Sequence, residues 1–202
     1  MLLVACPLSL VTLRMRAFLA VELPADIRRS LADLQSQLAK TRADVKWTEE
    51  ENLHITMRFL GELTGPQRQG LEEMLRRAAS RHHATTVQLD GLGAFPSVDS
   101  PRVLWVGIRE GQEELTKIAQ EIEQGVTALG LPKEDHQFSA HVTLGRVRSP
   151  KHRAQLVAAM RAVTWTRPEP FMATHLTLFQ STLTSAGARY TPLVKFPYSI
   201  KK

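Results

Sequence analysis

The sequence predicts an α+β fold with a largely antiparallel sheet, and three observations support this prediction. Apolar runs typical of strands alternate with amphipathic helical segments along only part of the chain. Two strand-like runs near the C-terminus are joined by a short turn, which is typical of a hairpin. A His-apolar-Thr-apolar pattern occurs twice, each time inside a strand-like run. A doubly wound parallel sheet would require regular strand–helix alternation, so the α+β class is favoured.

The first half of the chain predicts strands and helices in alternation. The apolar run that begins at Arg16 ends at Pro24, as a buried strand would. Gly61 is expected to end a later strand, and Pro66 lies where the first turn of a helix is expected. The expected elements are a strand at 16–23, a helix at 25–40, a loop at 47–52, a strand at 53–60 and a second helix that opens near Pro66 and has apolar residues at 71, 74, 75 and 78.

The second half predicts more strands than helices. The segment between the first two of these strands is rich in turn residues, and Gly130 and Pro132 close the long helix. The expected elements are strands at 85–92 and 102–108, a helix at 115–129, a strand at 140–147, a helix at 151–162, and strands at 175–183 and 190–196.

Length and composition exclude several classes of protein. The chain has 202 residues and a hydrophobic fraction of 43%, which suffices for a core and excludes a disordered tail or a fibre. Its one cysteine, Cys6, cannot form an internal disulfide. No CxxC or Cys/His zinc spacing occurs, so we expect neither a metal ion nor a cofactor.

The charge of the chain favours an anionic partner. Lys and Arg number 26 against 20 Asp and Glu, which gives a formal net charge of +6. Such an excess suits nucleic acid or a phosphate ester. A basic surface without a specific partner is an equally good interpretation of the charge alone.

The N-terminal segment 1–14 is expected to be a dispensable extension. Its apolar run ends at Leu13 and is shorter than the about 20 residues that a membrane helix needs. A signal peptide normally begins with a positively charged region, and no such region precedes this apolar run. We therefore expect a functional start at Met15, a single domain over 15–202, a cytoplasmic location and no membrane contact.

The repeated pattern predicts a catalytic site. Its copies are His54-Ile55-Thr56-Met57 and His141-Val142-Thr143-Leu144. Since side chains alternate along a strand, each copy would bury its two apolar residues and present an imidazole and a hydroxyl on the other face. If the two strands face one another, two imidazoles and two hydroxyls meet in one cleft.

This set of side chains suits phosphoryl chemistry without a metal. Histidine titrates near neutral pH, so one imidazole can accept a proton while the other donates one. Threonine hydroxyls can bond phosphoryl oxygens, and the nearby Arg58 and Arg146 can hold the anion. One such copy occurs often by chance, and a lone strand histidine is more often structural. Two copies in matching contexts favour catalysis.

Five segments, in order, resemble a known family. They are RAFLAVELP, WTEEENLHITMRFLGEL, PRVLWVGI, FSAHVTLGRV and LFQSTLTSAGARYTPL, and the resemblance extends from Arg16 to about Phe196. The chain resembles the two-histidine phosphoesterase superfamily, specifically the RNA 2′,3′-cyclic phosphodiesterases, also known as 2′-5′ RNA ligase-like proteins. The resemblance implies two pseudo-symmetric lobes around a central groove, with helices on the outside.

The resemblance also implies a role for each residue of the motif. His54 would protonate the departing ribose 3′ oxygen, and His141 would activate water, leaving a 2′-phosphomonoester on the RNA. Thr56 and Thr143 would orient the phosphoryl group, and Arg146 would contact it. In reverse, with a 5′-hydroxyl in place of water, the same groups would join RNA ends through a 2′-5′ bond. We expect a monomer.

Two features depart from the family pattern. Ser139-Ala140 stand where an Arg-Pro pair often precedes the second histidine, which puts part of the substrate contact in doubt. Strict alternation points Arg146 away from His141, unless a bulge at Gly145 re-aims it. Without a bulge, Arg58 is the better phosphate ligand.

Other residues have open or structural interpretations. Phe18 could stack on a base beside the groove, although its apolar strand favours a core position. His82 and His83 are expected to be solvated, and His175 to be structural despite its HxT letters. Several basic residues could line an RNA path or form a solvated face; they are Arg76, Arg77, Arg146, Arg148, Lys151 and Arg153.

Two other functions compete with the enzyme. A non-catalytic RNA-binding module would use the basic groove alone, with a steep salt dependence. A metal hydrolase would need several of the seven histidines, but no HExxH or carboxylate–histidine spacing supports it. The sequence leaves open the physiological substrate and the choice between hydrolysis and ligation.

Overall fold

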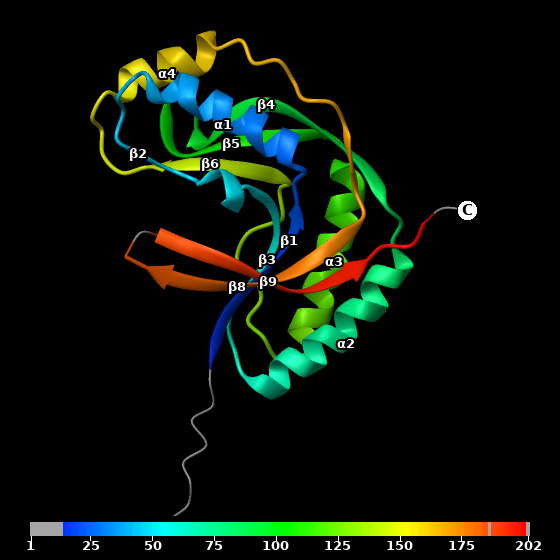
Figure 1. Cartoon of the computed structure of the whole chain (residues 1–202). Coiled ribbons are helices and arrows are strands. Elements are labelled where there is room, and N and C mark those ends of the chain that lie inside the picture. The colour runs from blue at the N-terminus through cyan, green and yellow to red at the C-terminus, as the bar shows by residue number, and fades with distance from the viewer. Residues whose placement is uncertain (1–13, 186, 201–202) are drawn as a thin grey trace, which may run out of the picture.

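A computed structural model describes residues 14–185 and 187–200, and its strands form one curled antiparallel sheet (Figure 1). The strands are β1 (Met15–Glu22), β2 (Val45–Trp47), β3 (His54–Leu63), β4 (Thr85–Ser97), β5 (Ser100–Glu110), β6 (His141–Val147), β7 (Phe171–Ala173), β8 (His175–Thr184) and β9 (Gly187–Pro197). The helices are α1 (Ala25–Ala39), α2 (Gly65–Arg81), α3 (Gln112–Ala128) and α4 (Arg153–Ala162), with the short 3-10 turn η1 at Glu50–Asn52. The predicted α+β class is confirmed. The expected extension 1–14 lies outside the described residues, except for Arg14.

The strand order interleaves the two halves of the chain. The order across the sheet is β7-β4-β5-β6-β3-β1-β8-β9, and β2 pairs with β6. The two strands that carry the repeated motif, β3 and β6, are neighbours at the centre. On one side of them lie β5, β4 and β7, and on the other β1, β8 and β9, so each side mixes early and late strands. The motif strands are therefore far apart in sequence but adjacent in the sheet.

The helices pack in two pairs, one on each side of the molecule. Figure 1 shows α1 and α4 beside β4, β5 and β6, while α2 and α3 lie toward β3 and β9. The side chains of Ile55 and Val142 are 0% exposed in the core, as the apolar face of each motif predicts. Burying such a side chain stabilises the fold by about 1.5–3 kcal/mol.

Several strand boundaries differ from those that the sequence predicts. Gly61 does not end β3, because it takes a φ of +67° and still pairs with Ala17 of β1. Strands β4 and β5 extend into the expected turn and leave only Val98 and Asp99 between them. Strands β2 and β7 were not predicted, since three residues are too few to show a period of two.

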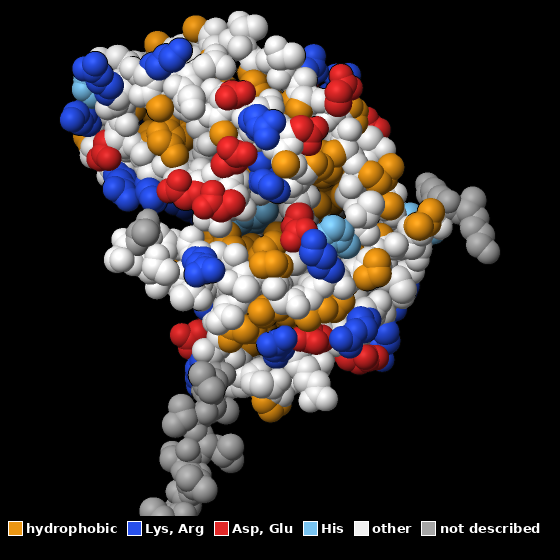
Figure 2. Space-filling model, in the orientation of Figure 1, with side chains coloured by type: hydrophobic (Ala, Val, Ile, Leu, Met, Phe, Trp, Pro, Cys, Tyr) orange, Lys and Arg blue, Asp and Glu red, His pale blue; other side chains and the backbone are white. Residues whose placement is uncertain are grey.

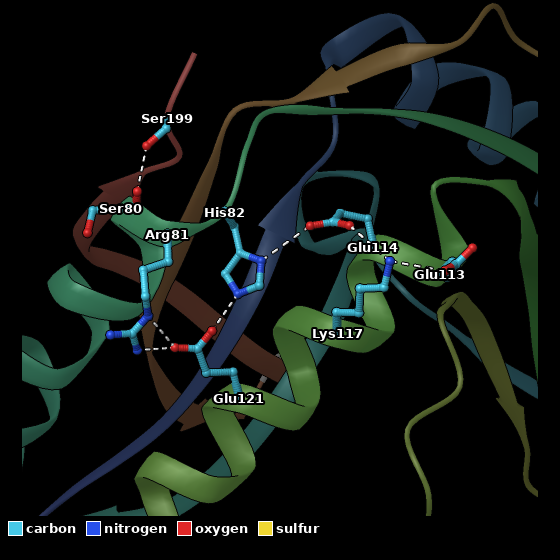
Figure 3. Close-up of polar contacts among 8 residues, drawn as sticks. All are labelled: Ser80, Arg81, His82, Glu113, Glu114, Lys117, Glu121 and Ser199. Carbon is cyan, nitrogen blue, oxygen red and sulfur yellow. Dashed lines mark hydrogen bonds and ion pairs between the residues drawn. The ribbon is translucent and has the colours of Figure 1, made fainter. Parts of the chain in front are cut away.

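The expectation that His82 is solvated is wrong. Its side chain is 12% exposed, and its ring nitrogens lie 3.3 Å from Glu114 and 2.7 Å from Glu121 of α3 (Figure 3). Burial raises the pKa of Glu121, but hydrogen bonds from Arg81 and His82 outweigh it and lower that pKa overall. The backbone N–H of Ser199 donates to the carbonyl of His82 at 2.8 Å. This cluster fastens the C-terminal segment and α2 to α3, so His82 has a structural role.

Candidate active site

The two motif copies meet side by side at the centre of the sheet. Ile55 of β3 pairs with Val142 of β6 in antiparallel register. The same register places His54 opposite Thr143 and Thr56 opposite His141. Residues opposite one another in such a pair have Cα atoms about 4.5–5.5 Å apart, with side chains on the same face. Two imidazoles and two hydroxyls thus form one patch, related by a pseudo-two-fold axis at the Ile55–Val142 pair.

Both imidazoles are oriented in the same way. The Nδ1 of His54 lies 2.6 Å from the carbonyl oxygen of Asn52, and the Nδ1 of His141 lies 2.7 Å from that of Ser139. A carbonyl only accepts, so each Nδ1 carries the proton and each neutral ring has its lone pair on Nε2. Thr56 Oγ1 lies 2.9 Å from Nε2 of His54 and donates to it in that tautomer. Each Nε2 is therefore the atom available for proton transfer.

Burial lowers the pKa values of both histidines, and a different neighbouring charge adds to the lowering of each. Burial lowers the pKa of His54, the hydrogen bond to Asn52 partly opposes this, and the charge of His141 lowers it further. Burial also lowers the pKa of His141, against the hydrogen bond to Ser139, and the charge of Arg146 adds to the lowering. The influence of His141 on His54 indicates that the two rings are close enough to interact electrostatically.

A bulge in β6 directs Arg146 toward the site. Leu104 pairs with Gly145 and Trp105 pairs with Thr143, so Leu144 is the extra residue of the bulge. The bulge was expected at Gly145, one residue later. Because of it, Arg146 is exposed and its charge acts on His141, although five residues separate the two. Arg146 is thus positioned beside the imidazole–hydroxyl patch.

A buried glutamine that the sequence analysis missed supports this bulge. Gln35 of α1 is 7% exposed, and its Nε2 donates to the carbonyl oxygens of Leu144 and Thr48, each at 2.8 Å. The backbone N–H of Thr48 also donates to the Leu144 carbonyl at 2.8 Å. The signal in the sequence is a polar residue on the apolar face of the predicted helix, between Leu34 and Leu38.

Arg58 does not reach the site, so its predicted contact with phosphate is wrong. The residue is 7% exposed, and its guanidinium donates to Glu123 at 2.5 Å and to Glu134 at 2.8 Å. It also donates to the backbone carbonyls of Phe59 and Pro132. The arginine therefore holds the segment that leads to β6 against β3 and has no free face for a substrate.

Phe18 is a core residue beside His54 and not a stacking surface. It is 3% exposed, and its ring centroid lies 4.9 Å from that of His54, 5.2 Å from Phe179 and 4.8 Å from Tyr190. Since its faces are covered, the prediction that it stacks on a base is wrong and its alternative interpretation as core holds. A cavity of about 180 Å³ lies next to these rings, and its wall includes Asn52.

Two other aromatic side chains are exposed near the site. Phe59 is 55% exposed and its ring centroid lies 6.2 Å from that of Phe18. Phe95 is 38% exposed and lies 5.3 Å from the ring of His141, edge to face. Sequence patterns did not single out either residue, because an aromatic residue in an apolar run normally indicates core.

The remaining predicted residues lie elsewhere. His175 bonds Glu22 at 3.1 Å through Nε2, which suits its structural interpretation. A wider depression of about 550 Å³ between α2 and α3 contains none of the predicted site residues. Within residues 14–185 and 187–200, no three His, Cys, Asp or Glu side chains are grouped so that they could hold a metal ion. Over the same ranges, no helix is long and apolar enough to cross a membrane.

Comparison with known families matches each half of the chain separately. A family model described as LigT like phosphoesterase matches residues 21–105 and, a second time, residues 106–190. The first match contains His54 and Thr56, and the second contains His141 and Thr143. The duplication that the repeated motif indicates thus extends over most of the chain.

Curated proteins and solved structures agree with this match. The RNA 2′,3′-cyclic phosphodiesterase of Aeropyrum pernix is 37% identical over 171 residues, which cover 85% of this chain and 94% of that protein. A protein of the same name from Escherichia coli K12 is 28% identical over 184 residues, 90% of this chain and 95% of its own length. The crystal structure of E. coli LigT complexed with 3′-AMP superposes with a TM-score of 0.74 at 28% identity, covering 92% of this chain and 99% of that one.

Proposed function

The chain belongs to the LigT-like phosphoesterase family, and on that premise we propose that it hydrolyses 2′,3′-cyclic phosphate ends of RNA to 2′-phosphomonoesters. Its relatives from Aeropyrum pernix and Escherichia coli are named RNA 2′,3′-cyclic phosphodiesterases, which supports this substrate. The observation on which the proposal chiefly rests is the pair of imidazoles on adjacent strands, each with Nδ1 bonded to a backbone carbonyl and Nε2 left for the substrate.

Binding of the cyclic phosphate uses the groups between and beside the imidazoles. The hydroxyls of Thr56 and Thr143 donate to non-bridging phosphoryl oxygens, and the guanidinium of Arg146 binds the same anion. Thr56 releases its bond to His54 when it turns to the substrate. A hydrogen bond between ionised groups contributes about 1.5–3 kcal/mol, so Arg146 is the strongest single contact of the three.

The two imidazoles then transfer protons on opposite sides of the phosphorus. Nε2 of His141 takes a proton from water while the water oxygen bonds to phosphorus. The bond from phosphorus to the ribose 3′ oxygen breaks, and Nε2–H of His54 gives its proton to that oxygen. Each proton transfer accelerates the reaction by roughly 10²–10⁴-fold. Solvent then removes the proton from His141 and returns one to His54.

The surroundings of the imidazoles support this division of roles. The positive charge of Arg146 favours the neutral form of His141, which is the form that a general base needs. His54 lies among aromatic rings, where the negative charge of a bound phosphate favours the protonated form that a general acid needs. Metal ions take no part in this proposal, so activity should persist in EDTA.

The test is product analysis with His54→Ala and His141→Ala variants. RNA ending in a 2′,3′-cyclic phosphate is incubated with each, and 2′- and 3′-phosphate ends are separated. We expect the wild type to form only the 2′-phosphate and each variant to be inactive, while circular dichroism and the melting temperature show a retained fold. Full activity in either folded variant would overturn the proposal, and RNA binding without turnover by the wild type would indicate the non-catalytic module.

The same steps with a different nucleophile would ligate RNA. With a 5′-hydroxyl end in the place of water, Nε2 of His141 takes the hydroxyl proton while the 5′ oxygen bonds to phosphorus. The bond from phosphorus to the 3′ oxygen breaks, Nε2–H of His54 protonates that oxygen, and a 2′-5′ phosphodiester remains. Incubation of 5′-hydroxyl RNA with a cyclic-phosphate end at high concentration tests for a 2′-5′ linkage. The expected monomer and cytoplasmic location stay predictions.

A further inference from the structure

We propose that Lys46 forms a second phosphate site that binds the phosphodiester one nucleotide upstream of the reacting cyclic phosphate, with Arg146 shared between the two phosphates. This inference rests on the proposed function and specifies its substrate class. The preferred substrate is RNA of two or more nucleotides rather than a mononucleotide.

The two cations stand directly opposite one another in the sheet. Lys46 of β2 pairs with Arg146 of β6, and both residues are exposed. Residues paired in this way have side chains on the same face, and like charges placed so are destabilising. An anion that bonds both side chains would relieve this repulsion, so the pair is suited to an anion site.

The pair lies next to the catalytic patch. Strand β5 occupies one edge of β6, so β3 and β2 share the other edge, with β3 at Val142 and β2 at residues 145–147. Along β6, the groove face therefore continues from His141 and Thr143 to Arg146, and from there one strand outward to Lys46. Strands are about 4.8 Å apart, which places Lys46 one step beyond the phosphate that Arg146 contacts.

The backbone of Lys46 packs closely against β6 in this position. A Cβ on Gly145 would lie 2.8 Å from Val45 Cγ1 and 3.0 Å from the Lys46 carbonyl oxygen, so β2 can pack here only because residue 145 is glycine. Gln35 bonds the backbone of Thr48 just after β2, which fixes the end of this strand. Lys46 is thus part of a built surface, unlike a lysine on a loose loop.

One acidic residue competes with the proposed ligand. Lys46 Nζ lies 3.3 Å from Glu49 Oε1, and both side chains are exposed. An exposed ion pair of this kind contributes about 0–1 kcal/mol, so a phosphate that also bonds Arg146 can displace the carboxylate. The basic side chains visible in Figure 2 are densest over the end of the molecule that holds β2 and α4.

The chemistry of RNA identifies the occupant. The terminal cyclic phosphate occupies the imidazole–hydroxyl patch in the proposed function, so the anion beyond it is the next phosphate of the same strand. A nucleoside 2′,3′-cyclic phosphate has no such group and should gain nothing from Lys46. The gain should therefore depend on substrate length and on the charge of the upstream linkage.

The experiment compares three substrates with the same terminal nucleoside. They are a nucleoside 2′,3′-cyclic phosphate, a dinucleotide with that cyclic end, and the dinucleotide with a neutral methylphosphonate linkage. We expect wild-type kcat/KM to be about 10-fold higher for the charged dinucleotide than for the other two, which corresponds to one charge-assisted bond.

Variants assign this preference to Lys46. Lys46→Ala should lower the dinucleotide preference to about 1 and leave kcat/KM for the nucleoside cyclic phosphate unchanged. Lys46→Arg should keep the preference, and Glu49→Gln should increase it. Lys117→Ala, which removes an exposed lysine on α3, is the control and should change nothing.

Two results would overturn this inference. One is a Lys46→Ala variant that keeps the dinucleotide preference, and the other is a wild type that hydrolyses the methylphosphonate dinucleotide as well as the charged one. In both cases the nucleoside cyclic phosphate is still hydrolysed, so the proposed function stands. Absence of turnover on all three substrates would instead refute the proposed function.

Discussion

The two motif strands, β3 and β6, agree in the residues that we propose to move protons and differ in the residues around them. Each carries His and Thr on one face, an Nδ1 bond to the carbonyl two residues earlier, and a bulge at the fourth motif residue, Met57 or Leu144. After the bulge, the equivalent positions are Arg58 and Gly145, both buried, and then Phe59 and Arg146, both exposed.

The residues that the two strands share would transfer the protons, and the residues that differ would decide the direction of transfer. A pair of imidazoles related by a two-fold axis cannot by itself decide which one donates a proton. The positions after the bulge break the symmetry, since one exposes a phenyl ring and the other a guanidinium. The cation beside His141 favours its neutral form, so the asymmetric positions assign the roles of base and acid in the proposed mechanism.

The largest expected effect tests these assigned roles. His54→Ala and His141→Ala should each lower kcat on a cyclic-phosphate RNA end by about 10²–10⁴-fold. If His54 is the acid, a substrate with sulfur in place of the 3′ oxygen should restore much of the activity of His54→Ala, because a thiolate leaves without protonation. The same substrate should leave His141→Ala impaired. Equal rescue of both variants would contradict the assignment.

Arg58 occupies the position in β3 that is equivalent to Gly145 in β6. Loss of the Arg58 side chain should lower the stability of the fold more than the rate of the reaction. Arg58→Met removes a buried cation from Glu123 and Glu134, which are partly exposed, so the free energy of unfolding should fall by about 2–4 kcal/mol. Urea unfolding measures this. The control is kcat of the folded variant, which should stay within a few-fold of wild type; a loss as large as that of His54→Ala would give Arg58 a direct role.

Arg146→Met should have a smaller effect on activity, together with a change in pH dependence. Loss of the phosphate contact should lower kcat/KM by about 10–100-fold. The variant also removes a charge that lowers the pKa of His141, so the acidic limb of the kcat/KM profile should move to higher pH. Phe59→Ala serves as the comparison and should leave that limb in place. An unmoved limb in Arg146→Met would separate Arg146 from His141.

The smallest expected effect is on stability as a function of pH. Burial lowers the pKa of His54 in the folded state below its ordinary value of about 6.5. Between the pKa of His54 in the folded state and its ordinary value, the unfolded chain binds more protons than the folded protein. The free energy of unfolding therefore rises with pH across this range and falls on acidification. His54→Gln should lose less stability than wild type between pH 8 and pH 5 in urea titrations. An equal or larger loss in the variant would contradict this.

The placement of the proposed catalytic residues was predictable because the signal is local. Alternation alone places His54 with Thr56, and His141 with Thr143, on one face of a strand, and the structure has them so. The direction of the Arg146 side chain was harder to predict, because it depends on the bulge at Leu144. The carbonyl of Leu144 accepts a hydrogen bond from Gln35 of a helix distant in sequence. The prediction that Arg58 binds phosphate was wrong for the same reason, since its partners Glu123 and Glu134 lie 65 and 76 residues away along the chain.

The sequence by itself determined the fold class, the main helices and strands, the duplicated motif and the face on which its side chains lie, since each follows from local periodicity and side-chain chemistry. Only the tertiary structure decided that β3 pairs with β6, that β2 sets Lys46 opposite Arg146, and that Arg58 is buried. The physical reason is that pairing register and burial are set by contacts between distant segments, which compete for the same core and leave no periodic trace in either segment alone.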